Sequence, residues 1–183
     1  MESQWNGYEE STLLGCGVYP LRRTSLDTPN GPSRPMSEVI DPIEGEGEPQ
    51  DIVDEALYFL KTHLVRRAFP IRGAGDRVIL YLTWYLHECI KSLVGLNRNE
   101  AQKAMLNRAV EGVVAPVDEG FVFSRFFSPG DDSEQDRWKS YATQLRVEAG
   151  SRLVEKIFLF PEEDGTGNKF WMAFAKRPFL LGG

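Results

Sequence analysis

The chain has 183 residues, of which 42% are hydrophobic and 26% are charged, and its formal net charge is −6. This composition is typical of a folded protein with enough chain to bury a sizeable core. Residues 1–50 carry nine acidic and three basic side chains, whereas acids and bases balance in the remainder. A neutral body with an acidic leader argues against nucleic acid, which requires a basic face, and against anionic membranes, which attract clustered Lys and Arg.

The two cysteines, Cys16 and Cys89, are too few for a disulfide framework, so the composition fits a reducing compartment. Residues 1–11 show neither the basic segment nor the apolar run of a secretory signal. We therefore expect a cytoplasmic protein, with the nucleus as the alternative.

Residues 1–50 are predicted to form an irregular acidic arm, and residues 51–183 a single helical domain. Six prolines interrupt every helical pattern in the arm, and the run EGEGEP at 44–49 is typical of a solvated loop. An apolar stretch, 13–21, is predicted to lie on the core as an extended segment. The acidic insertion at 36–48 is read as solvated loop, with a docking motif as the alternative.

The stretch 76–95 is apolar on nearly all sides of a helix. Val78 and Leu86 fall on one side, and Ile79 falls on another. A helix with this pattern must be buried on all sides. The polar residues at 87–88 interrupt the apolar run too early for a membrane span, which needs about 20 mostly apolar residues. We expect a central helix enclosed by other helices.

Further helical segments with apolar faces are expected to surround it, which gives an all-α fold of about five helices. Val110 is predicted to lie on the buried side of the segment 97–113, and Phe160 on the buried side of the segment 133–160. Glu148 and Arg152 are read as a weakly stabilising i,i+4 pair. Alternating Phe121 and Phe123 predict a short strand or an extended loop. The segments are 51–66, whose start is marked by Pro49 and Asp51, 97–113, 133–160 and 169–177.

Motifs for catalysis or cofactor binding are not recognised in the chain. The Gly73-Ala74-Gly75 helix start lacks the third glycine and the preceding strand of a dinucleotide site. His63 and His87 are read as polar boundary residues rather than metal ligands. We therefore predict no catalytic, cofactor-binding or metal-binding residue; an enzyme whose site is assembled without local motifs is the remaining alternative.

The C-terminal segment is unusual because it has too many aromatic residues for one helical face. Such a segment either closes the core or meets a partner protein, since Trp and Arg favour the centres of interfaces. The residues selected as a candidate partner interface are Trp171, Lys176, Arg177 and Phe179.

Four stretches, in order and with matching spacing, resemble subunit 3 of the actin-related protein 2/3 complex. They are DIVDEALYFLK at 51–61, DRVILYLTWYLHECIKSL at 76–93, YATQLRVEAGSRLVEKIF at 141–158 and NKFWMAFAKRPF at 168–179. The chain departs from the family pattern at the insertion 36–48, at 65–67 and in its short C-terminal end.

The resemblance implies an all-α fold with one helix enclosed by the others, and a non-catalytic structural subunit. It implies a hetero-oligomer in which the chain packs against actin-related proteins and other subunits of the complex, which nucleates branches on an actin filament. It also implies the actin cytoskeleton as location and no cofactor here, because ATP is held by the actin-related subunits. The departures keep one alternative open, a diverged helical adaptor outside the complex.

Overall fold

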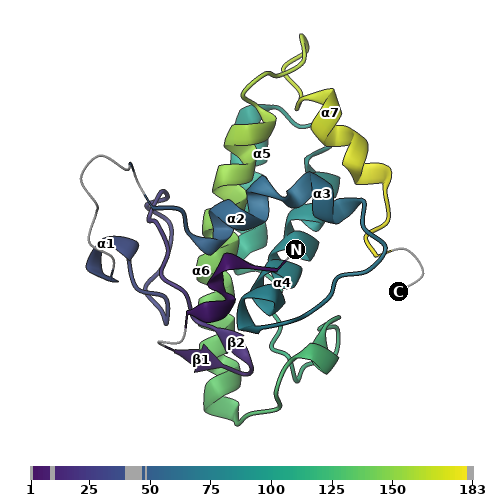
Figure 1. Cartoon of the computed structure of the whole chain (residues 1–183). Helices are drawn as coiled ribbons and strands as arrows, with labels where there is room; N and C mark the ends of the chain where they lie inside the picture. The colour runs from purple at the N-terminus through teal and green to yellow at the C-terminus, as the bar shows by residue number, and fades with distance from the viewer. Residues whose placement is uncertain (1, 9–10, 40–46, 48, 181–183) are drawn as a thin grey trace.

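A computed structural model describes residues 2–8, 11–39, 47 and 49–180. This part of the chain is mainly helical, as predicted, with one small antiparallel sheet that the sequence did not predict (Figure 1). The elements are the 3-10 helices η1 (Gln4–Gly7), η2 (Ser124–Phe126) and η3 (Ala173–Lys176), the strands β1 (Thr12–Leu13) and β2 (Cys16–Gly17), and the α-helices α1 (Met36–Val39), α2 (Ile52–Tyr58), α3 (Leu60–Leu64), α4 (Ala74–Leu93), α5 (Arg98–Val110), α6 (Asp132–Ile157) and α7 (Lys169–Met172).

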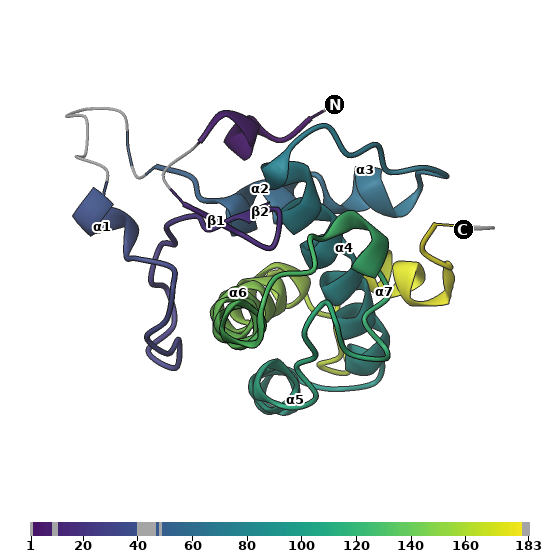
Figure 2. The ribbon, with the colours of Figure 1, turned by 90° about the horizontal axis from the view of Figure 1, so that it is seen from below.

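Helix α4 is the centre of the molecule. Seen from below, it lies among α2, α3, α5, α6 and α7, so that other elements cover it on several sides (Figure 2). This confirms the prediction of an enclosed helix, since apolar side chains on all its faces have lost contact with water. The fully or nearly fully buried residues of α4 include Val78, Ile79, Leu80, Tyr81, Leu82, Tyr85, Leu86, Cys89, Ile90 and Leu93.

Helices α5 and α6 pack side by side through small residues. A Cβ atom on Gly150 of α6 would lie 3.2 Å from the Cβ of Met105 of α5, so glycine permits this close approach. Ala109 is buried in the contact, whereas Val110 is exposed. The prediction for Val110 was wrong because the next position along a helix points about 100° away from the buried one.

The N-terminal arm packs on the helical core as an extended segment, as predicted for 13–21. Leu13, Tyr19 and Leu21 are buried, and β1 pairs with β2 through the registers Thr12↔Gly17 and Leu13↔Cys16. Apart from α1 and Gly47, the acidic insertion 36–48 lies outside the described residues.

Three predicted elements differ in detail. The helix predicted at 51–66 is divided into α2 and α3, because Phe59 leaves helical backbone angles (φ −94°, ψ 4°). The Phe121–Phe123 segment forms turns leading into η2 rather than a strand, and both phenyl rings are buried. The helix predicted at 169–177 is a short α-helix, α7, that continues as the 3-10 helix η3.

Helix α6 ends at Ile157, three residues before the predicted end. Pro161 has no N–H and cannot donate to the carbonyl of Ile157, which instead accepts a 3.1 Å hydrogen bond from the Asn168 N–H. Phe160, predicted to be buried, is therefore outside the helix and 73% exposed.

Candidate protein-interaction surface

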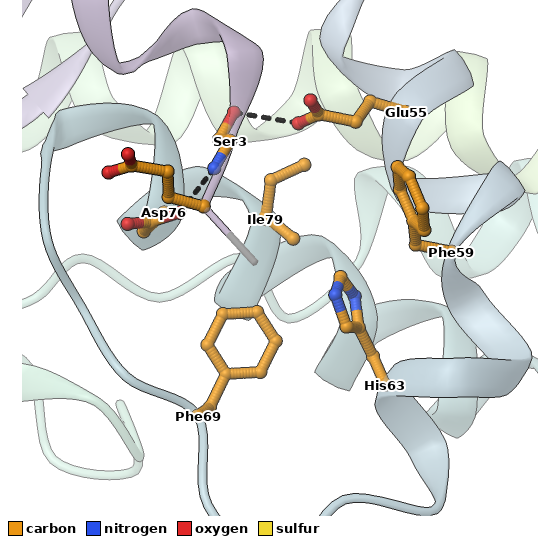
Figure 3. A pocket seen from close by; sticks show the side chains of 8 residues that line it. Ser3, Glu55, Phe59, His63, Phe69, Asp76 and Ile79 are labelled. Atoms are coloured by element: carbon orange, nitrogen blue, oxygen red, sulfur yellow. Dashed lines mark hydrogen bonds between the residues drawn. The ribbon is translucent and has the colours of Figure 1, made fainter.

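The first polar cluster of the molecule holds the N-terminal segment against α2 and α4. Ser3 donates from its N–H to Asp76 (2.8 Å) and from its hydroxyl to Glu55 (2.7 Å), as Figure 3 shows. The side-chain amide of Asn6 donates to Asp76 as well (3.0 Å). Two buried carboxylates are thus neutralised in part by hydrogen bonds from residues about 50 to 70 positions earlier in the chain.

His63 lies in the same cluster, with Phe59 and Phe69 beside it (Figure 3). Its imidazole is buried, and Nδ1 has no hydrogen-bond partner among the described residues. Burial, and secondarily the charge of Arg66, lowers the pKa of His63 to about 4. The cavity that these residues line measures about 10 Å³, which is room for no more than one water molecule. The cluster is therefore suited to holding the N-terminal segment rather than binding a metabolite.

A second buried network centres on Arg152 of α6. Its Nη1 and Nη2 donate to the two carboxylate oxygens of Asp51 at 2.7 and 2.8 Å, and Nη1 also reaches Asp54 at 3.1 Å. Glu148 lies 3.5 Å from Arg152 and accepts hydrogen bonds from the backbone N–H groups of Thr24 and Ser25. The network ties the N-terminal arm to α2 and α6.

Sequence reasoning underestimated this network. Glu148 and Arg152 are buried, which a weakly stabilising pair does not require, and Asp54 is paired with Arg152 and Arg22. Burial alone would raise the pKa of Asp54, but hydrogen bonds from Arg22 and the nearby positive charges outweigh it, and the pKa falls to about 2. The i,i+4 spacing indicated the pairing, but not its burial.

The C-terminal segment that contains the predicted interface residues is held at both ends. Asn168 caps α7 by accepting from the Phe170 N–H (3.0 Å) and donates to the carbonyl of Phe160 (2.9 Å). Further along, Nε2 of His87 on α4 lies 3.1 Å from the carbonyl oxygen of Phe174. Because a carbonyl can only accept, Nε2 carries the proton in this contact. These bonds fix the segment on the outside of α3 and α4.

The four selected residues are distributed along this segment. Trp171 is half-buried, with the ammonium of Lys61 4.2 Å from its ring centroid. Lys176 and Arg177 are exposed and form no ion pair within the described part of the chain. The half-buried ring of Phe179 lies 6.3 Å from that of His87.

A patch that sequence reasoning missed lies where α6 ends and α7 begins. Leu159, Phe160 and Phe170 are 67%, 73% and 66% exposed, and we call them the apolar end surface. The Asn168 side chain bonds both the Phe160 carbonyl and the Phe170 N–H, so these two residues are held near each other. Neighbouring exposed apolar residues of this size are typical of contact sites for other proteins. Pro161 is the feature of the sequence that could have indicated this patch, because it ends α6 before Phe160.

Within the described residues, no group of three His, Cys, Asp or Glu side chains is placed to hold a metal ion. None of the helices in that part of the chain has the length and hydropathy needed to cross a membrane.

The fold and surface together define a mainly helical protein with one enclosed helix and an exposed apolar patch at one end. Residues 1–182 match the family model described as the ARP2/3 complex ARPC3 (21 kDa) subunit. The chain therefore belongs to this family.

Similar proteins named actin-related protein 2/3 complex subunit 3 occur in distant eukaryotes. The Dictyostelium discoideum protein is 34% identical over 138 residues, which cover 75% of this chain and 78% of the relative. The Arabidopsis thaliana protein is 33% identical over 168 residues, which cover 91% of this chain and 87% of the relative. A Caenorhabditis elegans protein, named as a probable subunit 3, is 32% identical over 133 residues, with coverages of 71% and 72%.

Proposed function

We propose that this chain is a non-catalytic structural subunit of the actin-related protein 2/3 complex, and that it supports nucleation and branching of actin filaments in the cytoplasmic actin cytoskeleton. The observation that carries the proposal is the family match, which spans residues 1–182 and thus the whole folded unit. The neutral charge balance beyond residue 50 supports protein partners rather than nucleic acid or membrane.

Within the complex, the chain packs against an actin-related subunit through its C-terminal segment. The interface residues we propose are Trp171, Lys176, Arg177 and Phe179, together with the apolar end surface. The half-buried rings of Trp171 and Phe179, the exposed rings of Phe160 and Phe170, and two exposed basic groups without an ion pair among the described residues support this choice, because aromatic residues and Arg are enriched at the centres of interfaces.

The test is affinity purification of the tagged full-length chain from the cells that produce it. Actin-related proteins and the other subunits are expected in the eluate, and a complex assembled without the chain should form fewer branches under fluorescence microscopy. Recovery of the native protein only as a monomer would favour the helical adaptor instead.

A further inference from the structure

A surface hollow of about 540 Å³ lies on the opposite side of α4 from the N-terminal cluster. It is formed by the middle of α4, the last turns of α5 and the centre of α6. Two arginines and two aromatic rings are among its lining residues: Arg108, Arg146, Trp84 and Tyr85.

Arg146 is the unusual residue of this hollow because it is 5% exposed and has no carboxylate partner. It forms no ion pair within the described part of the chain. Nη2 donates to the carbonyl oxygens of Arg108 and Glu111, and the guanidinium carbon lies 4.6 Å from the Tyr85 ring centroid. Nε makes no hydrogen bond with any described residue, and the hydroxyl groups of Tyr81 and Tyr85 lie near the guanidinium.

The contrast with Arg152 shows what Arg146 lacks. Both arginines belong to α6 and are buried, but Arg152 is surrounded by three carboxylates, whereas the neighbours of Arg146 among the described residues are carbonyl oxygens, the Tyr85 ring and tyrosine hydroxyls. A buried charge without a counter-charge is costly, and proteins normally pair it. A second positive charge, Arg108, lies at the same hollow; its carboxylate neighbour Glu88 is 3.6 Å away and is shared with Lys91. The hollow therefore presents two positive charges, one of them without a carboxylate partner among the described residues, to an incoming anion.

The position of the hollow favours a carboxylate over a phosphate group. It lies at the C-terminal end of α5, where the helix dipole disfavours anions and a dianion about twice as strongly as a monoanion, and Glu111 adds a negative charge at its edge. A guanidinium whose Nε–H has no partner can donate to a single carboxylate. The aromatic ring of Trp84 offers an apolar surface for the carbon stem of such a side chain.

We propose that this hollow receives an acidic side chain, Asp or Glu, from a neighbouring protein chain, and that Arg146 and Arg108 bind its carboxylate. The inference rests on the proposed function, because it assigns a contact within the same assembly. It adds a second contact site, on a different face of α4 from the C-terminal segment.

The first test compares Arg146→Met with Arg137→Met, which alters an exposed arginine of the same helix. Both full-length variants are assembled with the remaining subunits. Arg146→Met should weaken association by about 30-fold or more, the usual effect of removing one partner of a buried charge pair. The melting temperature of the isolated variant should not fall below that of Arg137→Met, since an unpaired buried charge has been removed.

Unchanged association of Arg146→Met, or a fall in its melting temperature that accounts for the lost association, would overturn the inference. Arg108→Met, a change at a more exposed side chain, should give a weaker loss in the same direction. If the wild-type chain and Arg137→Met also fail to assemble, the proposed function itself is wrong.

The second test identifies the ligand class with acetate and inorganic phosphate as probes at constant ionic strength. The Nε–H resonance of Arg146 in the full-length chain is followed by NMR. A shift with acetate that is lost in Arg146→Met supports a carboxylate site. A response to phosphate alone, or to neither anion, overturns that assignment.

Discussion

His63 is buried beneath the N-terminal segment, and its pKa of about 4 is well below the ordinary value because burial disfavours the charged imidazolium. In the unfolded chain the same group titrates near 6.5. Between these values the unfolded state binds more protons, so acidification favours unfolding. The contribution of His63 to the free energy of unfolding is therefore largest above pH 6.5. This contribution is lost progressively as the pH falls from 6.5 towards 4.

The resulting prediction concerns His63→Phe. Urea unfolding of the wild type should lose roughly 3 kcal/mol between pH 6.5 and 4 through this residue. The variant should lose less over the same interval, because phenylalanine cannot be protonated. Parallel pH profiles for the two proteins would show that His63 is not held neutral by burial.

Arg152 is the residue on which the second network depends. Arg152→Ala leaves Asp51 fully buried and without its bidentate partner, so we expect a loss of about 3–5 kcal/mol in unfolding free energy. The double variant Arg152→Met, Asp51→Asn should be less destabilised than the single one, because it leaves no unpaired charge at position 51. Arg137→Ala, at an exposed site of α6, is the control and should change stability little.

At the scale of secondary-structure elements, the contact between α5 and α6 depends on side-chain size more than on hydrophobicity. The buried residues of α5 are Ala101, Met105 and Ala109, and Gly150 faces Met105 across the contact. The apolar area that α5 can bury is modest. Its packing therefore depends on the many van der Waals contacts that a close approach to α6 allows.

This predicts a specific effect of Gly150→Val. The branched side chain would overlap Met105 and separate the helices, at a cost of about 1–3 kcal/mol. Ser140→Val places the same side chain at an exposed position of α6 and controls for helix propensity. Thermal unfolding of both variants measures the loss of stability. An equal loss in the two variants would mean that helix propensity, and not the contact between α5 and α6, is responsible.

At the scale of the whole molecule, stability and assembly are assigned to different residues. The core around α4 is closed by the N-terminal arm, α2, α3, α5 and α6, whereas the apolar end surface contributes little to it because its side chains remain exposed. Exposed residues can be changed without loss of fold.

We therefore predict that Phe160→Ser combined with Phe170→Ser leaves the melting temperature nearly unchanged but weakens assembly with the other subunits by about tenfold or more. Leu26→Ser, which alters an exposed apolar residue of the arm, is the matched control and should assemble normally. Co-purification with titrated subunits measures the effect; normal assembly of the double variant would exclude the apolar end surface as a contact.

Local pattern was sufficient to predict the central helix and the start of α2. An apolar pattern on all sides of 76–95 indicated an enclosed helix, and Asp51, which marked the predicted start of the next helix towards the N-terminus, is the N-cap of α2, with a reciprocal hydrogen bond from Asp54. The early end of α6 could also have been predicted from the sequence, because Pro161 lacks the N–H that would donate to the carbonyl of Ile157.

Apolar periodicity and capping residues are local features, so they were enough to place the main helices, and the family resemblance indicated the class of protein. The pairing of buried charges became visible only in the folded molecule. Ser3 reaches Asp76 across 73 positions and Arg152 reaches Asp51 across 101, whereas Arg146, six residues from Arg152 on the same helix, has no carboxylate partner among the residues that the structure describes. Hydrophobic periodicity indicates which face of a helix is buried, but the partner of a buried charge depends on how distant segments of the chain pack together.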